Sequence, residues 1–470
     1  MRISTFRIIL SIAFITFFTV LYGESTKQRV IALTDITNEP DDEQSMVRFL
    51  LYSNHYEVEG LIATSSIHLQ TKTREDRIRE IVDAYGKVRD NLNLHEPGFP
   101  TEAYLHSVIK AGMPKFGMEG VGPGMDTEGS EWIIKVVDKN DSRPVWISVW
   151  GGTNTLAQAL WKVRQTRTID ELAKFVSRLR VYTISDQDDS GPWIRREFPE
   201  LFYVVSAGAY YGRATWSGIS GEQWYGFSSA ADTTIVSNTW LINNIIENHG
   251  PLGAQYPRTA YIMESDSPSY MWLINNGLNE SGKPNFGGWG GRYELYTPHF
   301  SSYIRYDYEM PETRPIWTDA MDEVAGYTSN HATIWRWREA FQNDFAARMD
   351  WCIKPYDEAN HPPVARLKGG NEVILRMGES VTLDASESSD PDNDGLKFKW
   401  IHYPEAGTYF HWRGNRGIIL ENSDSAITTL TIPLETDVQK PNTTHLILQV
   451  TDSGTPALTR YQRIIVNIMP

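Results

Sequence analysis

Short apolar runs of strand length alternate with helical segments along most of the chain, and this alternation restricts the fold more than any other feature. The runs cover residues 30–33, 58–63, 145–149, 179–184 and 201–205. Polar or glycine residues end each run, and apolar residues in the segments between them recur at helical spacing. Strands that alternate with helices form a mostly parallel sheet with helices on both faces. The sequence therefore predicts an α/β fold over residues 27–355.

The character of the sequence changes near residue 364, after a proline-rich linker over residues 355–363. Short strand-like segments then follow one another, separated by turn residues. They cover residues 373–375, 381–383, 396–400, 429–432, 446–450 and 464–468. About seven short strands in about a hundred residues are typical of an immunoglobulin-like sandwich. We therefore expect a small all-β immunoglobulin-like domain over residues 364–470.

The N-terminus has the pattern of a secretory signal peptide. Arg2 and Arg7 precede an apolar run from Ile8 to Tyr22, and small residues follow it. The run is short for a membrane span, so we expect a signal peptide over residues 1–23, with an uncleaved anchor as the alternative. Cys352 is the only cysteine, so an intramolecular disulfide is impossible. These features predict a secreted or periplasmic protein without other membrane contact.

Charge and aromatic content restrict the partners. A formal net charge of -15 argues against nucleic acid and anionic membranes. Several of the 16 tryptophans lie in glycine-rich loops, where a ring can stack on a sugar. Trp289 is the candidate of this kind, with core packing as the alternative. The sequence indicates a carbohydrate partner and leaves the oligomeric state open.

An acidic loop from Thr34 to Glu43 lies where the first predicted strand ends and a helix begins. Its oxygen-bearing side chains are Asp35, Asn38, Glu39, Asp41, Asp42 and Glu43. Oxygen ligands of this kind suit calcium. In α/β folds, ligands are held at the carboxyl ends of the strands. A helix cap is the alternative, because the helix dipole also favours acidic residues at a helix start.

Further acidic groups follow, with Asp186, Asp188 and Asp189 after one strand and Glu264 and Asp266 later in the chain. Carboxylates that converge at one sheet edge repel one another unless a cation or a proton holds them. We therefore favour a cation site over a set of helix caps. The sequence contains no phosphate-binding loop, nucleophile elbow or zinc motif, so serine-nucleophile chemistry has little support.

Three motifs together resemble the nucleoside hydrolase family. They are Thr34-Asp35 with Asp41-Asp42, Gly60-Leu61-Ile62-Ala63-Thr64, and Trp150-Gly151-Gly152-Thr153-Asn154-Thr155-Leu156-Ala157. With its predicted sandwich, the whole chain more closely resembles a family of secreted bacterial nucleoside hydrolase-like proteins. The activity of that family is largely unknown, and one branch is described as cellulose-binding. The resemblance implies a nucleoside hydrolase-like sheet over roughly residues 28–355, followed by the sandwich.

The resemblance also implies a calcium site. Its carboxylate ligands would be Asp35, Asp41, Asp42 and Asp266. A main-chain carbonyl of Trp150 or Gly151 would complete the shell. One departure stands out, because a gapless match puts Thr37 where the family has a further aspartate. Asn38 would then have to take its place.

The activity implied by the resemblance is hydrolysis of a glycosidic bond by a calcium-bound water, with Asp35 or Asp41 as the base. Three residues are equally open as the acid for the leaving group: His68, Asp189 and Glu197. The candidate substrate-binding residues are Asn38, Asn154, Asp186, Asp189 and Trp289.

The leading hypothesis is an exported glycoside hydrolase acting on a polysaccharide or oligosaccharide fragment. A non-catalytic, cellulose-like carbohydrate-binding protein is the first alternative. A nucleoside N-ribohydrolase is the second, ranked lower because the family's base-recognising loops have no match in this sequence.

Overall fold

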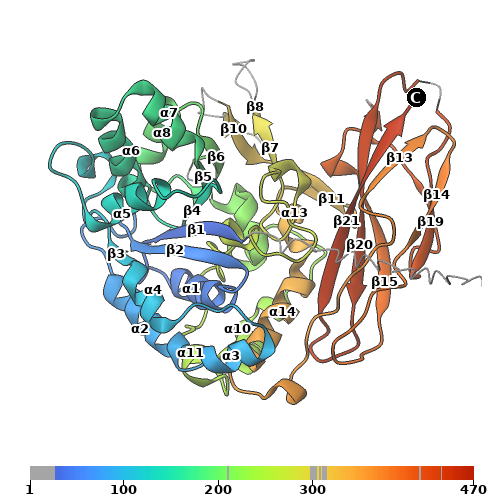
Figure 1. Cartoon of the computed structure of the whole chain (residues 1–470), viewed down its shortest axis with the longest axis horizontal. Helices are drawn as coiled ribbons and strands as arrows, with labels where there is room; N and C mark the ends of the chain where they lie inside the picture. The colour runs from blue at the N-terminus through green and yellow to red at the C-terminus, as the bar shows by residue number, and fades with distance from the viewer. Residues whose placement is uncertain are drawn as a thin grey trace, which may run out of the picture.

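The computed structural model describes residues 27–208, 211–296, 304–305, 308–309, 315–411, 414–435 and 437–470. The predicted signal peptide over residues 1–23 lies outside the described residues. An α/β part is followed by an all-β part that packs against its side (Figure 1). None of the helices in the described part of the chain is long and apolar enough to cross a membrane.

The α/β part is organised around one eight-stranded sheet. In spatial order its strands are β3 (Ile109–Ala111), β2 (Tyr56–Ala63), β1 (Gln28–Thr34), β4 (Val145–Val149), β5 (Leu179–Ser185), β6 (Phe202–Ser206), β10 (Ile316–Asp319) and β7 (Tyr293–Tyr296). Every neighbouring pair is parallel except β10 and β7, which are antiparallel. The five apolar runs of the sequence form the centre of this sheet, whereas β3, β10 and β7 complete its edges.

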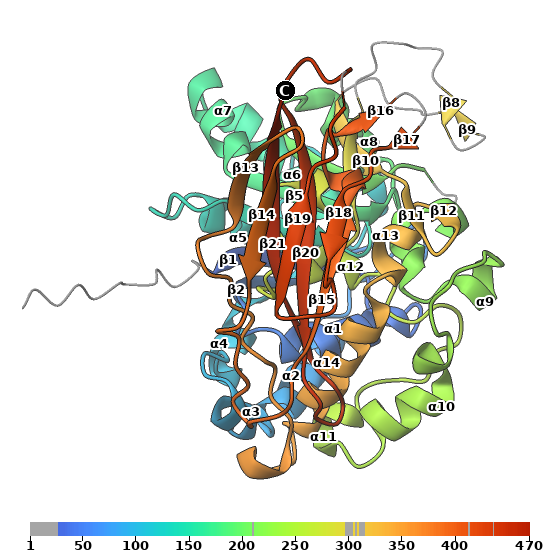
Figure 2. The ribbon, with the colours of Figure 1, turned by 90° about the vertical axis from the view of Figure 1, so that its right-hand side faces the viewer.

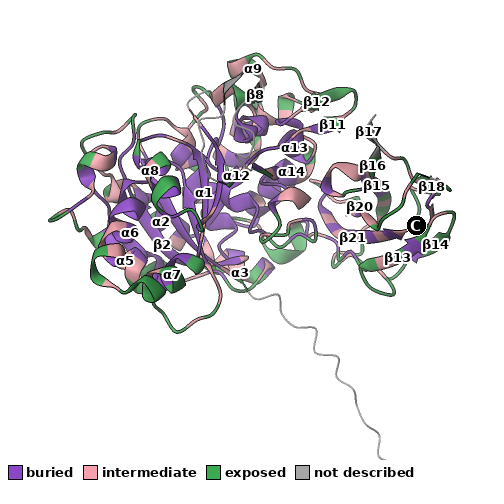
Figure 3. Ribbon diagram, turned by 90° about the horizontal axis from the view of Figure 1, so that it is seen from above, coloured by how far each residue is buried: buried purple, intermediate pink, exposed green. Residues whose placement is uncertain are grey.

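Helices cover both faces of the sheet (Figures 1 and 3). One core contains residues of α1 (Asp41–Leu51), α2 (Glu75–Gly86) and α14 (Arg338–Asp350). The other core contains residues of α5 (Glu128–Val137), α6 (Asn154–Thr166) and α8 (Ser190–Glu197). Strand β1 alternates between them, because Val30 and Ala32 lie in the first core and Ile31 and Leu33 in the second. The predicted fold class is confirmed.

Two details of the predicted chain path are wrong. Residues 91–129 read as an irregular region, yet they include most of α3 (Arg89–His95), α4 (Glu102–Val108) and strand β3. These elements are too short to produce a clear period between the glycines and prolines. A single helix is predicted over residues 333–351, whereas the structure has α13 (Ala332–Trp335) and then α14, with Arg336 and Trp337 between them.

The C-terminal part is built mainly of two sheets that face each other (Figure 2), with a small two-stranded sheet of β16 (Phe410–His411) and β17 (Gly414–Asn415) beside them. The larger has the order β13 (Glu372–Arg376), β21 (Thr459–Met469), β20 (Asn442–Thr451) and β15 (Lys397–Tyr403). The smaller has the order β14 (Ser380–Asp384), β19 (Ile427–Thr431) and β18 (Ile419–Glu421). Trp400 and Leu448 from the larger sheet and Leu383 and Leu430 from the smaller share one buried core. This is the expected sandwich packing.

Buried polar contacts fix the sandwich against the α/β part. Arg463 of β21 donates to the carbonyls of Leu278 and Gly287, each at 2.9 Å. Arg460 donates to Asp344 of α14 at 2.6 Å. Groups this well buried are costly to leave unpaired, so these contacts hold the two parts in one arrangement.

Candidate metal centre

The strand order places a crevice beside the acidic loop. Strand β1 lies between β2 and β4, and the chain proceeds outward in one direction through β2 and β3 and in the other through β4, β5 and β6. The crevice outside the carboxyl ends of the strands at such a reversal is where open α/β sheets bind ligands. The loops after β1, β2, β4 and β5 all begin at this edge because those strands are parallel.

Helix α1 brings two acidic loops together. Asp41 and Asp42 lie in its first turn, and the buried Arg48 further along it forms a two-pronged ion pair with Glu264. Gln44 of the same helix accepts the main-chain N–H of Glu264 at 3.0 Å. With Glu264 held in this way, oxygens of Asp41, Asp42 and Asp266 lie within 4.8 Å of one another.

Both acidic loops contain an uncommon backbone conformation. Thr37 has φ of 89° and Glu264 has φ of 51°, a region that residues with a side chain rarely adopt. Such conformations persist where the surrounding structure imposes them, and they concentrate at functional sites. Here the arginine pair on Glu264 supplies one such constraint.

In the described part of the chain, no cationic side chain neutralises the converging carboxylates. Among the described residues, Asp35, Asp41, Asp42 and Asp266 form no ion pair with arginine, lysine or histidine. Burial, followed by repulsion from neighbouring carboxylates, raises the pKa of Asp42 and Asp266 well above the usual value. Burial likewise raises the pKa of Asp35 and of Asp41 to about 7 in each case.

Several oxygens at this point lack any partner. Asp41 Oδ1, Asp266 Oδ2 and Gln187 Oε1 are buried without a hydrogen bond. Hydroxyl groups occupy two further oxygens, with Thr34 donating to Asp42 Oδ1 and Ser265 to Asp41 Oδ2. Buried acceptors of this kind are costly unless a cation or a donor is present. Orphaned carboxylate and amide oxygens are the donor set that a hard cation such as calcium prefers, so the residues present fit the group.

Asp35 lies between two strand ends. Ser66, from the loop after β2, donates to its Oδ2. Gly151, from the loop after β4, approaches so closely that a Cβ built on it would lie 2.4 Å from Asp35 Oδ1. Residue 151 of the Trp150-Gly151-Gly152 motif must therefore be a glycine, because a side chain there would collide with the Asp35 carboxylate.

These groups open onto a cavity of about 340 Å³, here called the acidic cavity. Its acidic lining residues are Asp35, Glu39, Asp41, Asp42 and Asp266. Its aromatic lining residues are Trp150, Tyr211, Trp216, Trp224, Tyr225 and Tyr261. A larger cavity of about 1160 Å³ lies at the opposite edge of the sheet, beside the first residues of β1 and β2. No residue of the acidic cavity lines it, so the candidate metal ligands belong to the smaller cavity.

The structure brings together the four predicted metal ligands and one of the three candidate acids. His68 lines the acidic cavity, with Nδ1 3.9 Å from the Glu39 carboxylate and Nε2 3.4 Å from the Tyr211 hydroxyl. Asn38 is exposed and does not line the cavity, so it does not replace the aspartate missing at Thr37. The Thr37 hydroxyl instead accepts from Arg74 at 3.2 Å.

Three other predicted substrate-binding residues hold the loops in place. Asn154 is completely buried and donates to Ser65 Oγ at 2.8 Å. Asp186 forms a bidentate pair with Arg195 at 2.8 and 2.9 Å. Asp189 accepts the main-chain N–H of Met118 at 2.8 Å. None of the three lines the acidic cavity, so their hydrogen bonds give them a structural role.

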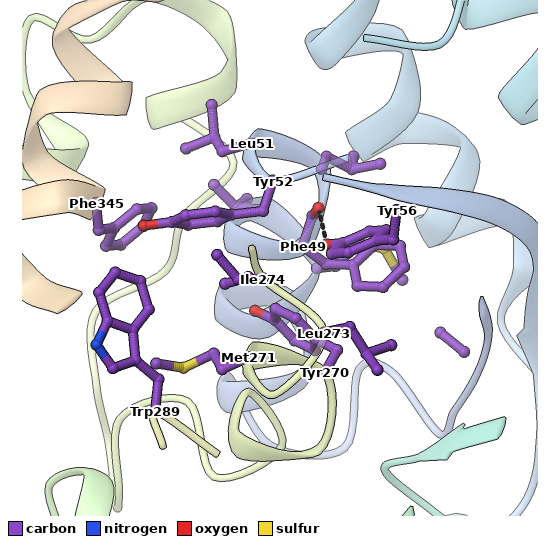
Figure 4. Close-up of a cluster of buried hydrophobic side chains, with 14 of the residues drawn as sticks. Phe49, Leu51, Tyr52, Tyr56, Tyr270, Met271, Leu273, Ile274, Trp289 and Phe345 are labelled. Carbon is purple, nitrogen blue, oxygen red and sulfur yellow. Dashed lines mark hydrogen bonds between the residues drawn. The ribbon is translucent and has the colours of Figure 1, made fainter. Parts of the chain in front are cut away.

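Glu197 and Trp289 lie away from the acidic cavity. Glu197 ends α8 and pairs with Arg164 at 2.8 Å on the protein surface. Trp289 has no exposed surface and packs in the apolar core beside Met271 (Figure 4). The interpretation of Trp289 as a stacking residue is therefore wrong, because packing leaves neither face of the ring for a sugar.

Sequence reasoning missed most of the cavity's other walls. Glu39 and Gln187 lie in the acidic loops that the sequence identified, but the predicted site residues were their neighbours in those loops. Gln187 donates to the Trp150 carbonyl at 2.6 Å, the same main-chain group expected to complete a metal shell. The aromatic walls Tyr211, Trp224 and Tyr261 come from segments without regular periodicity. Only their clustering among glycine and serine residues pointed to a binding surface.

Comparisons with known proteins identify the family. The family model described as "Cellulose-binding Sde182, nucleoside hydrolase-like domain" matches residues 29–293. The model described as "Cellulose-binding protein Sde0182, C-terminal domain" matches residues 380–468. A solved nucleoside hydrolase-related hypothetical protein from Saccharophagus degradans, associated with carbohydrate metabolism, is 36% identical. That match covers 94% of this chain and 100% of the other, with a TM-score of 0.78.

Other likenesses are partial. The PKD domain of the KIAA 1837 protein is 24% identical over 22% of this chain and 87% of its own, with a TM-score of 0.15. The endo-fucoidan hydrolase MfFcnA4 is 14% identical over 23% of this chain and 14% of its own, with a TM-score of 0.16. No curated protein matches the chain. The two family models and the full-length structural match show that the chain belongs to the family of cellulose-binding Sde182-type proteins with a nucleoside hydrolase-like domain.

Proposed function

We propose that this protein is an exported, calcium-dependent hydrolase that cleaves a glycosidic bond in a carbohydrate. The observation that carries the proposal is the group of carboxylates formed by the half-buried Asp41 and the buried Asp42 and Asp266. It has orphaned oxygens and, among the described residues, no cationic partner. A protein that only needed a helix cap would leave these side chains in solvent. Keeping them buried and unpaired costs stability, and function is the usual reason for such a cost.

Asp41, Asp42 and Asp266 would hold the calcium ion, with Asp35 beside them. When bound, calcium supplies a Lewis acid that makes a water molecule easier to deprotonate and orients sugar hydroxyls. The chain's own residues do the remaining work. Ser66 fixes one oxygen of Asp35 and leaves Oδ1 beside the glycine loop, which suits a general base.

His68 is the best candidate for the acid that protonates the leaving group. It is the only one of the three sequence candidates that lines the acidic cavity. The Glu39 carboxylate lies near Nδ1, and the Tyr211 hydroxyl contacts the other ring nitrogen. A proton donor in this cavity would supply the leaving-group proton that cleavage through an oxocarbenium-like transition state needs.

A specific observation also supports a second candidate, a carbohydrate-binding protein that has lost the chemistry. Thr37 stands where the family's further aspartate is expected, and its hydroxyl is turned toward Arg74. The family descriptions name cellulose binding, which fits this alternative and an extracellular location. Nucleoside hydrolysis ranks third, because no residue of this chain matches the base-recognising loops.

One experiment separates the three. The protein, supplied with calcium, is incubated with soluble oligosaccharides, insoluble cellulose, inosine and uridine. We expect released reducing sugar that disappears when calcium is chelated or when Asp41 is changed to Asn. Retention on cellulose without product would support the binding protein, and release of free base would support the nucleoside hydrolase. If the protein neither retains nor cleaves any carbohydrate, the proposal is wrong.

A further inference from the structure

A second cavity adjoins the acidic cavity and shares two of its walls. This side cavity has a volume of about 370 Å³. Trp224 of α9 (Glu222–Tyr225) and Tyr261 line both cavities. Their rings contact edge to face, with centroids 4.9 Å apart and planes at 73°. We refer to this pair of rings as the aromatic ridge.

The aromatic ridge is unusually open to solvent. Trp224 is 53% exposed and Tyr261 is 51% exposed. Single exposed aromatic residues need no explanation, but two touching rings between two cavities form an apolar surface with a defined position. Such a surface suits the C–H face of a sugar ring, with hydroxyl groups directed toward the polar walls on either side.

The structure ties the aromatic ridge to the acidic centre. Tyr261 precedes Glu264 by three residues, and Glu264 is held by Arg48 of α1. Trp224 is followed directly by Tyr225, which lines the acidic cavity. A ligand unit on the ridge would therefore keep a fixed position relative to Asp41 and Asp266.

The walls of the side cavity indicate a neutral, hydroxyl-rich ligand. No lysine or arginine lines it, and its lining includes Ser220, Gln223 and Thr233. Its one acidic lining residue, Glu222, pairs through Oε1 with Arg338 at 2.7 Å. Glu222 Oε2 is buried without a partner, and the side chain is only 9% exposed. A carboxylate oxygen in that position can accept a hydrogen bond from a sugar hydroxyl and would repel an anionic group.

From these observations we propose that the side cavity is a second sugar subsite. The substrate would then be a neutral oligosaccharide of at least two units that crosses the aromatic ridge. The inference rests on the proposed function and deepens it by assigning a binding position to a sugar unit beyond the acidic cavity. Each cavity lies near the lower limit of the range of about 300–1,000 Å³ for ligand pockets, so each suits about one small unit. The absence of lysine and arginine from the lining of either cavity disfavours polymers of uronic or sulfated sugars.

The test compares ligand length in the presence of calcium. Calorimetry measures binding of cello-, xylo- and manno-oligosaccharides of one to six units to the full chain. We expect affinity to rise at the second unit in at least one series, and Trp224→Ala to weaken binding of the longer ligands at least about tenfold. Calcium affinity should not change, and binding of a single unit should weaken less than binding of the longer ligands, because Trp224 lines both cavities. Trp224→Phe, which keeps a ring, should restore most of the loss.

The control variant is Phe410→Ala, which removes a ring that is 57% exposed but lies in the C-terminal sandwich. It should bind every ligand as the wild type does. The inference is overturned if no neutral series binds, if affinity is independent of length, if Trp224→Ala matches the wild type, or if a uronic acid oligomer binds equally well. Loss of calcium binding or turnover with the length effect intact would instead contradict the proposed function alone.

Discussion

Two groups of buried aspartates in this protein have opposite surroundings. At the junction with the sandwich, Asp344 accepts from Arg460 at 2.6 Å and from Arg348 at 3.2 Å. Asp322 there pairs with Arg292 at 2.7 Å and with Arg336 at 2.8 Å. At the sheet edge, Asp41, Asp42 and Asp266 face one another, and no arginine or lysine among the described residues pairs with them.

The ionisation of the two groups differs accordingly. Burial opposes ionisation of Asp344, but Arg460 and Arg348 outweigh it and bring the pKa to about 2. Burial acts unopposed by any cation on Asp41, whose pKa rises to about 7. The fold supplies two arginines to each of Asp322 and Asp344 and, among the described residues, none to the sheet-edge group. This contrast is the main reason for assigning function to the sheet edge.

The largest effect on stability is expected when an arginine-paired aspartate at the junction with the sandwich is removed. Asp344→Ala would remove the carboxylate that pairs with Arg460 and would leave Arg348 with Glu96 alone. We expect the free energy of unfolding to fall by about 3–5 kcal/mol, the usual cost of removing one partner of a buried pair. Urea denaturation of the metal-free protein measures it. A loss below about 1 kcal/mol would mean that the pair is not held as described.

At the sheet edge, removing a carboxylate should increase the free energy of unfolding instead of lowering it. Asp266→Asn removes one of the repelling carboxylates and keeps the size of the side chain. We expect the metal-free protein to become more stable by about 1 kcal/mol, as relief of a strained functional site often does. Calcium binding should be lost at the same time. Destabilisation of the metal-free variant would contradict the repulsion argument.

The two groups also predict opposite pH dependence for the metal-free protein. The pKa values of Asp35 and Asp41 are about 7 in the folded state, above the ordinary value of about 4. Between these values the folded state holds protons that the unfolded state has lost, so stability falls as pH rises from about 4 to 7. For Asp344, stability falls as pH drops from about 4 to 2.

Thermal unfolding across the pH range measures both changes in stability. Saturating calcium should abolish the loss of stability between pH 4 and 7. Calcium affinity should increase through that interval, because the ligand carboxylates lose their protons. An equal slope in the Asp35→Asn, Asp41→Asn double variant would show that other groups produce it.

The sequence predicted the sheet, the sandwich and the carboxylates of the candidate centre, because each produces a pattern among residues that are close together in the sequence. Strand-end polarity identified Asp35, Asp41 and Asp42, and the family resemblance added Asp266. What brings Asp266 to Asp41 is the pairing of Arg48 with Glu264 across a long stretch of chain. No local pattern encodes that contact. Trp289 was misassigned for the same reason, since a glycine-rich sequence does not reveal whether its aromatic ring faces inward.

The smallest effect is expected at Glu197, the candidate acid that lies on the surface away from the acidic cavity. Glu197→Gln removes a surface pair with Arg164 and should change stability by less than about 1 kcal/mol. Product release and calcium affinity should stay at wild-type levels, because Glu197 does not line the acidic cavity. A large loss of turnover in this variant would return Glu197 to consideration as the acid.

Calcium titration by calorimetry is the most direct test of the central claim. It would compare the metal-depleted wild type, the Asp41→Asn, Asp42→Asn double variant, and Asp189→Asn as a control on the same sheet edge. The account predicts a calcium-binding event that the wild type and the control share and the double variant lacks. Equal calcium binding by the double variant and the wild type, or no binding by the wild type, would contradict it.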